Sequence, residues 1–129
     1  MRILITGGPS TGKTTLARRL SQQHGIPVFH SDDLIGIHHW SGASDEVKRW
    51  IEQPGPWIIE GVAVPRALRK WYAEHGEQGT PADSVIWLQE PHIKHTPGQA
   101  TMAKGLQTVW EQVQPLLEGS GVPIRGRAD

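Results

Sequence analysis

Residues 3–16 read ILITGGPSTGKTTL, and this stretch decides how the chain folds. Gly7 and Gly12, followed by Lys13 and Thr14, match the pattern G-x-x-x-x-G-K-[ST]. An apolar run comes before the glycines and a helical pattern follows the lysine, as in a strand, a loop and a helix in succession. The stretch therefore predicts a phosphate-binding loop, in which backbone N–H groups and a helix N-terminus face an anion.

The residues of this loop have separate expected roles toward ATP. Lys13 supplies charge for the β and γ phosphates, the Thr14 hydroxyl is the expected ligand of Mg²⁺, and Thr15 helps to hold the α phosphate. The alternative is a glycine-rich turn that carries Lys-Thr by chance, and the complete motif in a strand-loop-helix context disfavours it. The predicted nucleotide-binding residues of the loop are Gly7, Gly8, Pro9, Ser10, Thr11, Gly12, Lys13, Thr14 and Thr15.

Length and composition narrow the classes of protein that fit. With 129 residues we expect a single domain, 1–129, and 13 basic against 13 acidic side chains give no global field toward nucleic acid or anionic membrane. The chain has no cysteine, which excludes disulfides and thiolate chemistry, and no asparagine, which excludes the Asn-Lys-x-Asp element that reads guanine. No run approaches a membrane span, so we expect a soluble, cytoplasmic protein that does not enter a membrane.

Short apolar runs alternate with helical patterns, which is typical of an α/β fold with a parallel sheet and crossover helices. The predicted strands are 2–6, 27–30, 57–60, 84–88 and 122–125, and the first helix is 13–24. A second helix is expected to follow Ser44, whose hydroxyl would cap it. Pro65 fits the first turn of a third helix that Gly76 ends, and a fourth starts at Pro97. Pro115 is expected to kink or end that fourth helix, and the tail 126–129 is expected to be mobile.

Polar side chains follow the predicted strands where ligands bind in an open parallel sheet. The sequence after the second strand is His30-Ser31-Asp32-Asp33, and Glu60 ends the third strand. We predict that Asp32 accepts the proton of an acceptor hydroxyl, while Asp33 and Glu60 hold Mg²⁺ through water. The alternative is that Asp32 or Asp33 simply caps the next turn.

Arg66 and Arg69 lie about one helical turn apart, so they share a helix face. They are candidates to clamp a phosphate or sugar of the acceptor. The alternative is that both are solvated surface charges.

The first 34 residues resemble the small P-loop kinases, in the segment GGPSTGKTTLARRL and the segment VFHSDDL that follows it. This group includes polynucleotide 5′-hydroxyl kinases, relatives of zeta-toxin and chloramphenicol phosphotransferase, and adenylate-kinase-like enzymes. The resemblance implies a three-layer P-loop NTPase fold with a five-stranded sheet of order 2-3-1-4-5, ATP and Mg²⁺ as cofactors, and Asp32 as general base. IIEGVAVPR is similar to the third-strand region of adenylate-kinase-like members, which implies a substrate-phosphate role for Arg66.

The chain also departs from this family. A short lid-like segment at about 89–104 contains no arginine, and Lys94 and Lys104 are its only strong cations. No arginine follows the acidic pair within 34–40. Arg125 or Arg127, after the last strand, is then the candidate to supply one, and the family resemblance places that last turn, with Arg127, near the adenine.

Weaker signals are histidine pairs and tryptophans. His92 with His95, and the adjacent His38 and His39, lack an evenly spaced acidic ligand, which disfavours a transition-metal site. Most of the six tryptophans fit core positions, whereas Trp40 lies in a loop where a base or aromatic acceptor would stack.

Together these features predict an ATP- and Mg²⁺-dependent kinase. Its acceptor would be a small molecule that carries a hydroxyl or a phosphate, such as a nucleoside or nucleotide, with a polynucleotide 5′ end as another candidate. The alternatives are an ATP-binding regulatory protein with weak or no phosphotransfer, and a degraded kinase that binds phosphate without turnover. The residues do not specify an oligomeric state.

Overall fold

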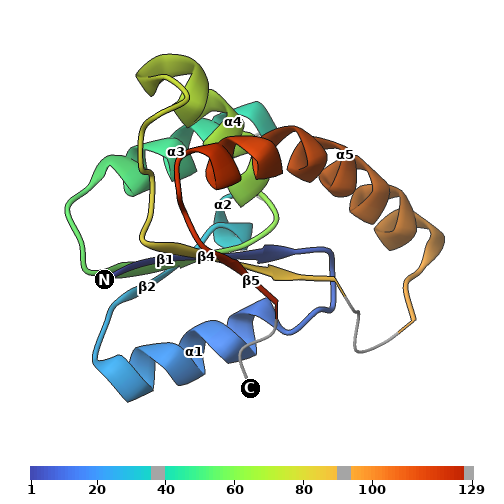
Figure 1. Ribbon diagram of the computed structural model, residues 1–129. Helices are drawn as coiled ribbons and strands as arrows, with labels where there is room; N and C mark the ends of the chain where they lie inside the picture. Colours follow the sequence, from blue (N-terminus) through green and yellow to red (C-terminus); the bar gives the residue numbers. More distant parts are fainter. Residues whose placement is uncertain (36–39, 90–93, 127–129) are drawn as a thin grey trace.

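The computed structural model describes residues 1–35, 40–89 and 94–126, with the backbone alone for Ile35 and Trp40 (Figure 1). Strands and helices alternate along most of the chain. In chain order the elements are β1 (Arg2–Gly7), α1 (Lys13–His24), β2 (Val28–His30), α2 (Asp32–Ile35), α3 (Trp40–Glu52), β3 (Trp57–Glu60), α4 (Val64–His75), β4 (Ser84–Leu88), α5 (Pro97–Gly119) and β5 (Ile124–Arg125).

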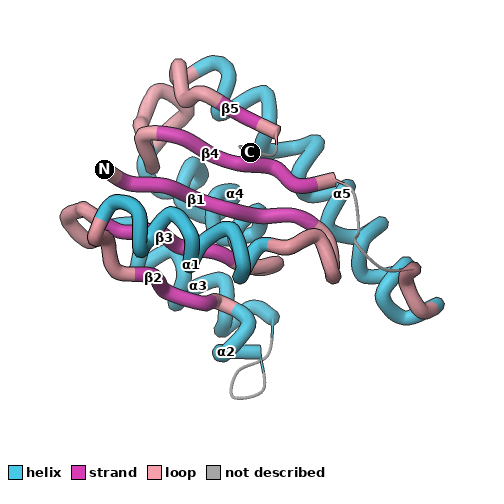
Figure 2. Tube along the Cα trace, turned by 90° about the horizontal axis from the view of Figure 1, so that it is seen from below, coloured by secondary structure: helices cyan, strands magenta, loops and turns pink. Residues whose placement is uncertain are grey.

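The five strands form one parallel sheet in the order β2-β3-β1-β4-β5 (Figure 2). β1 lies at the centre, where Ile3 is in register with Ile58 of β3 and Ser84 of β4. The phosphate-binding loop therefore leaves the middle of the sheet, with β3 on one side and β4 on the other. The predicted fold class and the predicted strand order are confirmed.

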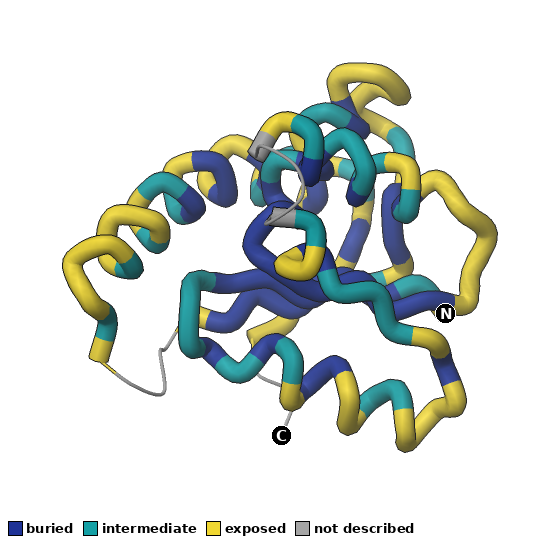
Figure 3. The backbone as a smooth tube through the Cα atoms, turned by 180° about the vertical axis from the view of Figure 1, so that it is seen from behind, coloured by how far each residue is buried: buried dark blue, intermediate teal, exposed yellow. Residues whose placement is uncertain are grey.

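The sheet is the middle of three layers, with α1 on one face and α3, α4 and α5 on the other (Figure 1). The sheet has a hydrophobic core on each face, and the side chains of β4 point to the two cores in alternation. Val85 and Trp87 pack on the α4 and α5 side, while Ile86 and Leu88 pack on the α1 side. The three central strands, β1, β3 and β4, are almost entirely buried between these layers, whereas the edge strands β2 and β5 are partly exposed (Figure 3). No helix in the described part of the chain is both long enough and apolar enough to cross a membrane.

The second predicted helix starts earlier than expected. α3 begins at Trp40, so Ser44 lies inside the helix, where its hydroxyl donates to the carbonyl of Ser41 (3.0 Å). The buried side chains of Ala43, Val47 and Ile51 repeat every four residues, and their packing against α4 accounts for the additional helical turn. The expectation that Ser44 caps this helix is therefore wrong.

The prolines of the C-terminal region also change the predicted bounds. α5 continues through Pro115 to Gly119 because Leu117 is buried beyond the proline, and the carbonyl that loses a partner belongs to the exposed Glu111. Pro115 therefore does not end the helix, and the alternative expectation, a kink at this position, stays a prediction. β5 covers two of the four expected residues, since Pro123 has no N–H to pair. Of the tail expected to be mobile, residues 127–129 lie outside the described residues.

Candidate active site at the phosphate-binding loop

The loop between β1 and α1 has the close-packed geometry that its glycines predict. Gly7 has φ +156°, and a Cβ there would lie 2.3 Å from the carbonyl oxygen of Leu88, so only glycine fits between β1 and β4. The Thr11 hydroxyl donates to the Gly8 carbonyl (2.9 Å), and the Lys13 ammonium donates to the same oxygen (2.8 Å). The described contacts thus hold both the loop and its lysine in place.

Lys13 is buried, with 6% of its surface exposed, and it lies among carboxylates. Burial lowers the pKa of Lys13 below its usual value, while the charges of Asp32 and Glu60 act in the opposite direction. Residues from the ends of β2 and β3 therefore face the lysine of the loop, as the sequence predicts for a site at the carboxyl ends of the strands.

Glu60 is the most deeply placed of these carboxylates, with 1% of its surface exposed. Its Oε2 accepts from the Thr14 hydroxyl (3.3 Å), and its Oε1 lies 3.0 Å from Nδ1 of His30. The structure thus brings together Thr14 and Glu60, two of the three residues predicted to hold Mg²⁺. The third, Asp33, is exposed and makes no described contact with either.

Asp32 begins α2 and contacts the link between β3 and α4. Its Oδ1 accepts from the backbone N–H of Val62 (3.1 Å), which lies 30 residues further along the chain. This bond fixes one carboxylate oxygen to a neighbouring strand end, and the other is not engaged in a described hydrogen bond. The described bond is not a cap of the turn that follows Asp32.

A cavity of about 450 Å³ lies over the loop. Besides loop residues 9–15 it is lined by Asp32 and Val62 and by Gln99 and Met102 of α5. A second cavity, of about 370 Å³, adjoins the loop at Thr11 and lies between the ends of β4 and β5. Its other lining residues are Trp87, Leu88, Gln89, Ile124, Arg125 and Gly126.

The start of α5 reaches the loop through a residue that sequence reasoning did not select for this place. Nε2 of His95 lies 2.7 Å from the Pro9 carbonyl, so the ring donates to the loop backbone. Thr96 caps the helix in a capping box with Gln99, and Gln99 also lines the 450 Å³ cavity. In the sequence, His95 stands out only as part of a histidine pair and a disfavoured metal ligand, and no sequence pattern links it to Pro9.

The two arginines of α4 have different surroundings. Arg66 is half-buried, and both its burial and the charge of Arg69 lower the pKa of its guanidinium. It lies beside α5 near Gly105, and it is not a lining residue of either cavity. Arg69 is exposed and donates to Gln112 of α5 (2.9 Å). The role of Arg66 toward an acceptor stays a prediction.

Several other sequence predictions fall on positions that the structure does not describe. Arg127, His38, His39 and His92 lie outside the described residues, as does the side chain of Trp40. Arg125, the other arginine considered after the last strand, lines the second cavity.

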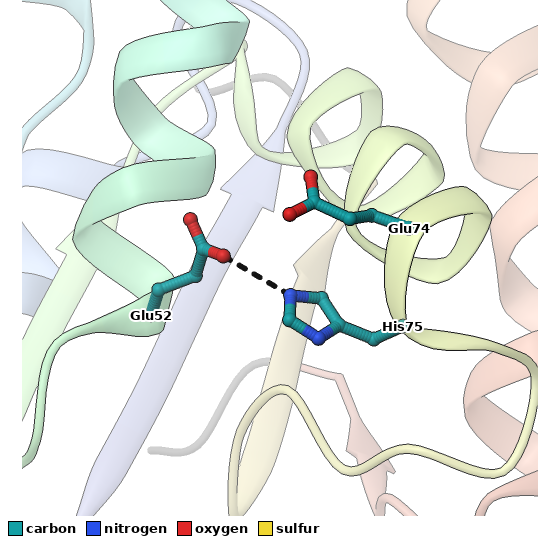
Figure 4. A group of neighbouring side chains, drawn as sticks. All are labelled: Glu52, Glu74 and His75. Carbon is teal, nitrogen blue, oxygen red and sulfur yellow. Dashed lines mark hydrogen bonds and ion pairs between the residues drawn. The ribbon is translucent and has the colours of Figure 1, made fainter.

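Away from the loop, Glu52, Glu74 and His75 have ligand atoms within 4.8 Å of one another (Figure 4). Nε2 of His75 lies 3.0 Å from Glu52, and the Lys48 ammonium contacts the Glu74 carboxylate. Both contacts connect α3 to α4, whose packing accounts for the group without a metal ion.

A family model described as an AAA domain matches residues 2–35, which contain the phosphate-binding loop and the acidic pair. No curated protein is similar enough in sequence to match the chain. The sequence match is therefore confined to the nucleotide-binding part of the chain.

Solved structures resemble the chain over nearly its whole length. Shikimate kinase from Aquifex aeolicus is 14% identical with a TM-score of 0.56, and the match covers 100% of this chain and 89% of that one. YorR protein from Bacillus subtilis, in complex with phosphorylated GDP, is 14% identical with a TM-score of 0.51, over 98% of this chain and 85% of that one. Shikimate kinase from Acinetobacter baumannii, in complex with shikimate, is 12% identical with a TM-score of 0.50, over 98% and 84%.

The chain thus has the three-layer α/β fold of the P-loop NTPases, in the form found in small kinases. The predicted resemblance to small P-loop kinases is confirmed at the level of the fold.

Proposed function

We propose that the protein is a kinase that transfers the γ-phosphoryl group of ATP to a small acceptor. The observation that carries this proposal is the buried Lys13 beside Asp32 and Glu60, under a cavity of about 450 Å³. A lysine on a phosphate loop, opposed by carboxylates at neighbouring strand ends, provides both the charge and the base that phosphoryl transfer needs.

ATP would occupy both cavities. The loop residues 7–15 would hold the phosphates, and the second cavity has an apolar wall of Trp87, Leu88 and Ile124 suited to the base. In this arrangement Arg125, the last residue of β5, would lie beside the base, and the role of Arg127 stays a prediction.

The oxygen ligands at Thr14 fit Mg²⁺. The Thr14 hydroxyl donates a hydrogen bond to Glu60, so the lone pairs of its oxygen remain for a metal ion. Glu60 would accept a hydrogen bond from a metal-bound water, and Asp33 is the further candidate for such a role. When bound, Mg²⁺ would neutralise charge on the β and γ phosphates.

Asp32 would act as the general base. Its Oδ1 is held by the Val62 N–H, which leaves Oδ2 to accept the proton of an acceptor hydroxyl in the 450 Å³ cavity. The acceptor oxygen then forms a bond to the γ phosphorus as the bond to the β,γ-bridging oxygen breaks. Lys13 stabilises the negative charge that collects on the leaving phosphate.

The size of the cavity supports a small acceptor. A space of this size, shared with the phosphates, suits a small hydroxyl- or phosphate-bearing molecule such as a nucleoside or nucleotide, or the 5′ end of a polynucleotide. For an acceptor with a phosphate, Arg66 on α4 is the predicted contact.

The test is transfer of labelled γ phosphate to nucleosides, nucleotides, 5′-hydroxyl oligonucleotides and small hydroxylated metabolites, with Lys13→Ala as the blank. Asp32→Asn should lower kcat by roughly 10²- to 10⁴-fold and leave ADP affinity within about threefold, because it removes the base alone. Asp45→Asn is the matched control, since Asp45 pairs with Lys70 on α4. Unchanged transfer in Lys13→Ala or Asp32→Asn would contradict the proposal.

A second candidate is an ATP-binding regulatory protein with weak or no phosphotransfer. It is favoured by the lining of the 450 Å³ cavity, which includes no arginine among the described residues. ATP binding without transfer to any member of the panel would favour this second candidate over the kinase.

A further inference from the structure

His30 forms the outer end of a chain of hydrogen bonds that leads to the phosphate-binding loop. β2 and β3 are paired so that His30 lies in register with Glu60, and Nδ1 of the ring is 3.0 Å from Glu60 Oε1. The other carboxylate oxygen, Oε2, accepts from the Thr14 hydroxyl (3.3 Å). A strand edge is thus connected to the first turn of α1 through one buried carboxylate.

The direction of these bonds follows from the chemistry of the three groups. An ionised carboxylate only accepts, so Nδ1 of His30 carries a proton and donates it. The Thr14 hydroxyl uses its only hydrogen in a hydrogen bond to the same carboxylate, so the lone pairs of its oxygen stay available to a metal ion. In the described residues, His30 and Thr14 are the hydrogen-bond donors to the Glu60 side chain. Without His30, the carboxylate loses the contact that fixes its Oε1 and thereby its plane.

We propose that His30 is a positioning residue, which orients Glu60 so that the Thr14 hydroxyl presents its lone pairs to Mg²⁺. This inference rests on the proposed nucleotide and magnesium site and adds to it the group that holds the metal-facing hydroxyl in place. His30 touches neither nucleotide nor metal in this arrangement. Partners of this kind typically change metal affinity by about 10- to 100-fold when they are removed.

The test measures ADP affinity by calorimetry, with Mg²⁺ and with a chelator, at one neutral pH. The ratio of the two affinities reports how strongly Mg²⁺ supports nucleotide binding, and it needs no turnover. For His30→Ala we expect this ratio to fall by about tenfold. His30→Asn, whose amide N–H is at a reach similar to Nδ1, should keep the ratio within about threefold of the wild type.

Two further variants separate positioning from packing. His30→Phe keeps a planar ring but has no hydrogen-bond donor, so its ratio of ADP affinities should fall as it does in His30→Ala. If the alanine variant folds poorly, the phenylalanine variant decides the result. His75→Ala removes a histidine that lies at the same 3.0 Å from a carboxylate, that of Glu52, but on the α3–α4 contact. It should leave the ratio unchanged.

An unchanged ratio in His30→Phe, or a loss in His30→Asn as large as in His30→Phe, would overturn the inference. The inference would also be overturned if the wild-type protein bound ADP equally well with and without Mg²⁺. In that case the nucleotide site of the proposed kinase would still stand, because ADP binds. Absence of ADP binding under both conditions would instead overturn the proposed function itself, and with it this inference.

Discussion

Replacing Gly61 with alanine tests how closely the ends of β2 and β3 are packed at the candidate active site. Gly61 has φ +142°, and a Cβ there would lie 1.7 Å from the Ser31 hydroxyl oxygen and 2.9 Å from Oδ1 of Asp32. Ser31 is fully buried, and its Cβ would also lie 2.9 Å from the new methyl group, so rotating the hydroxyl away does not remove the overlap. The substitution therefore combines backbone strain with overlap of buried atoms.

The two costs have separate magnitudes. A non-glycine residue in such a backbone conformation costs about 1–3 kcal/mol. Overpacking of a close-packed site costs about 1–3 kcal/mol more. We expect Gly61→Ala to lower the free energy of unfolding by about 2–6 kcal/mol, measured by urea denaturation with tryptophan fluorescence. The displaced Asp32 should also lower any phosphotransfer activity.

A double-mutant cycle separates these two costs. In a Ser31→Gly background the overlap with Ser31 disappears, and the 2.9 Å approach to Oδ1 of the exposed Asp32 remains. Gly61→Ala should there cost little more than the strain of about 1–3 kcal/mol, because an exposed side chain can move away. Gly76→Ala is a matched control, because Gly76 has φ +89° and a Cβ there would meet nothing within 4 Å. A loss below about 1 kcal/mol for Gly61→Ala, or the same loss in both backgrounds, would contradict this account of the packing.

Three further changes have expected outcomes. Lys13→Met should remove ADP binding at neutral pH, because it removes the buried ammonium that faces the phosphate site. Since the folded-state pKa of Lys13 lies below its unfolded value, the wild type should gain stability as pH rises through that lowered pKa, and Lys13→Met should lack this gain in a pH series of urea melts. Trp110→Ala should lower the free energy of unfolding by about 3–5 kcal/mol in the same assay, because Trp110 is 2% exposed and its ring centroid lies 4.4 Å from that of Trp87. A loss under about 1 kcal/mol would contradict this. Gly119→Ala should stabilise the end of α5 by about 0.5 kcal/mol, seen as a higher melting temperature, because a Cβ there meets no atom within 4 Å; destabilisation would show that the position needs glycine.

The parts of the structure that the sequence predicts well depend on local patterns. The strand, loop and helix of residues 2–24 follow from glycine spacing and apolar runs, and the bounds of β3 and β4 match the predicted ones. The order of the strands came from the family resemblance. α3 was misplaced at its start because burial against α4, rather than the cap signal at Ser44, decides where that helix begins.

The contacts within the candidate site were harder to predict because they join residues far apart in the chain. The pairing of His30 with Glu60 depends on the register of β2 and β3, which the apolar pattern of two short strands does not specify. The contact of His95 with Pro9 spans 86 residues and depends on where the segment before α5 runs. Composition at the strand ends indicated which groups would be near the loop, but not which of them would touch.

α5 is buried along its second half and exposed along its first half, and the segment before it contacts the loop through the bond of His95 to the Pro9 carbonyl. Its buried side chains run from Leu106 to Leu117, whereas none of residues 97–105 is buried, as the exposed outer end of the helix in Figure 3 shows. At about 1.5 Å per residue, the segment 97–105 is about 13 Å long, so a tilt of roughly 10° about Leu106 would move the N-terminus of the helix by about 2 Å. Substitutions in the two halves of the helix should therefore have different effects. Those near Trp110 should change the stability of the fold, and those near Gln99 should change the width of the cavity over the loop.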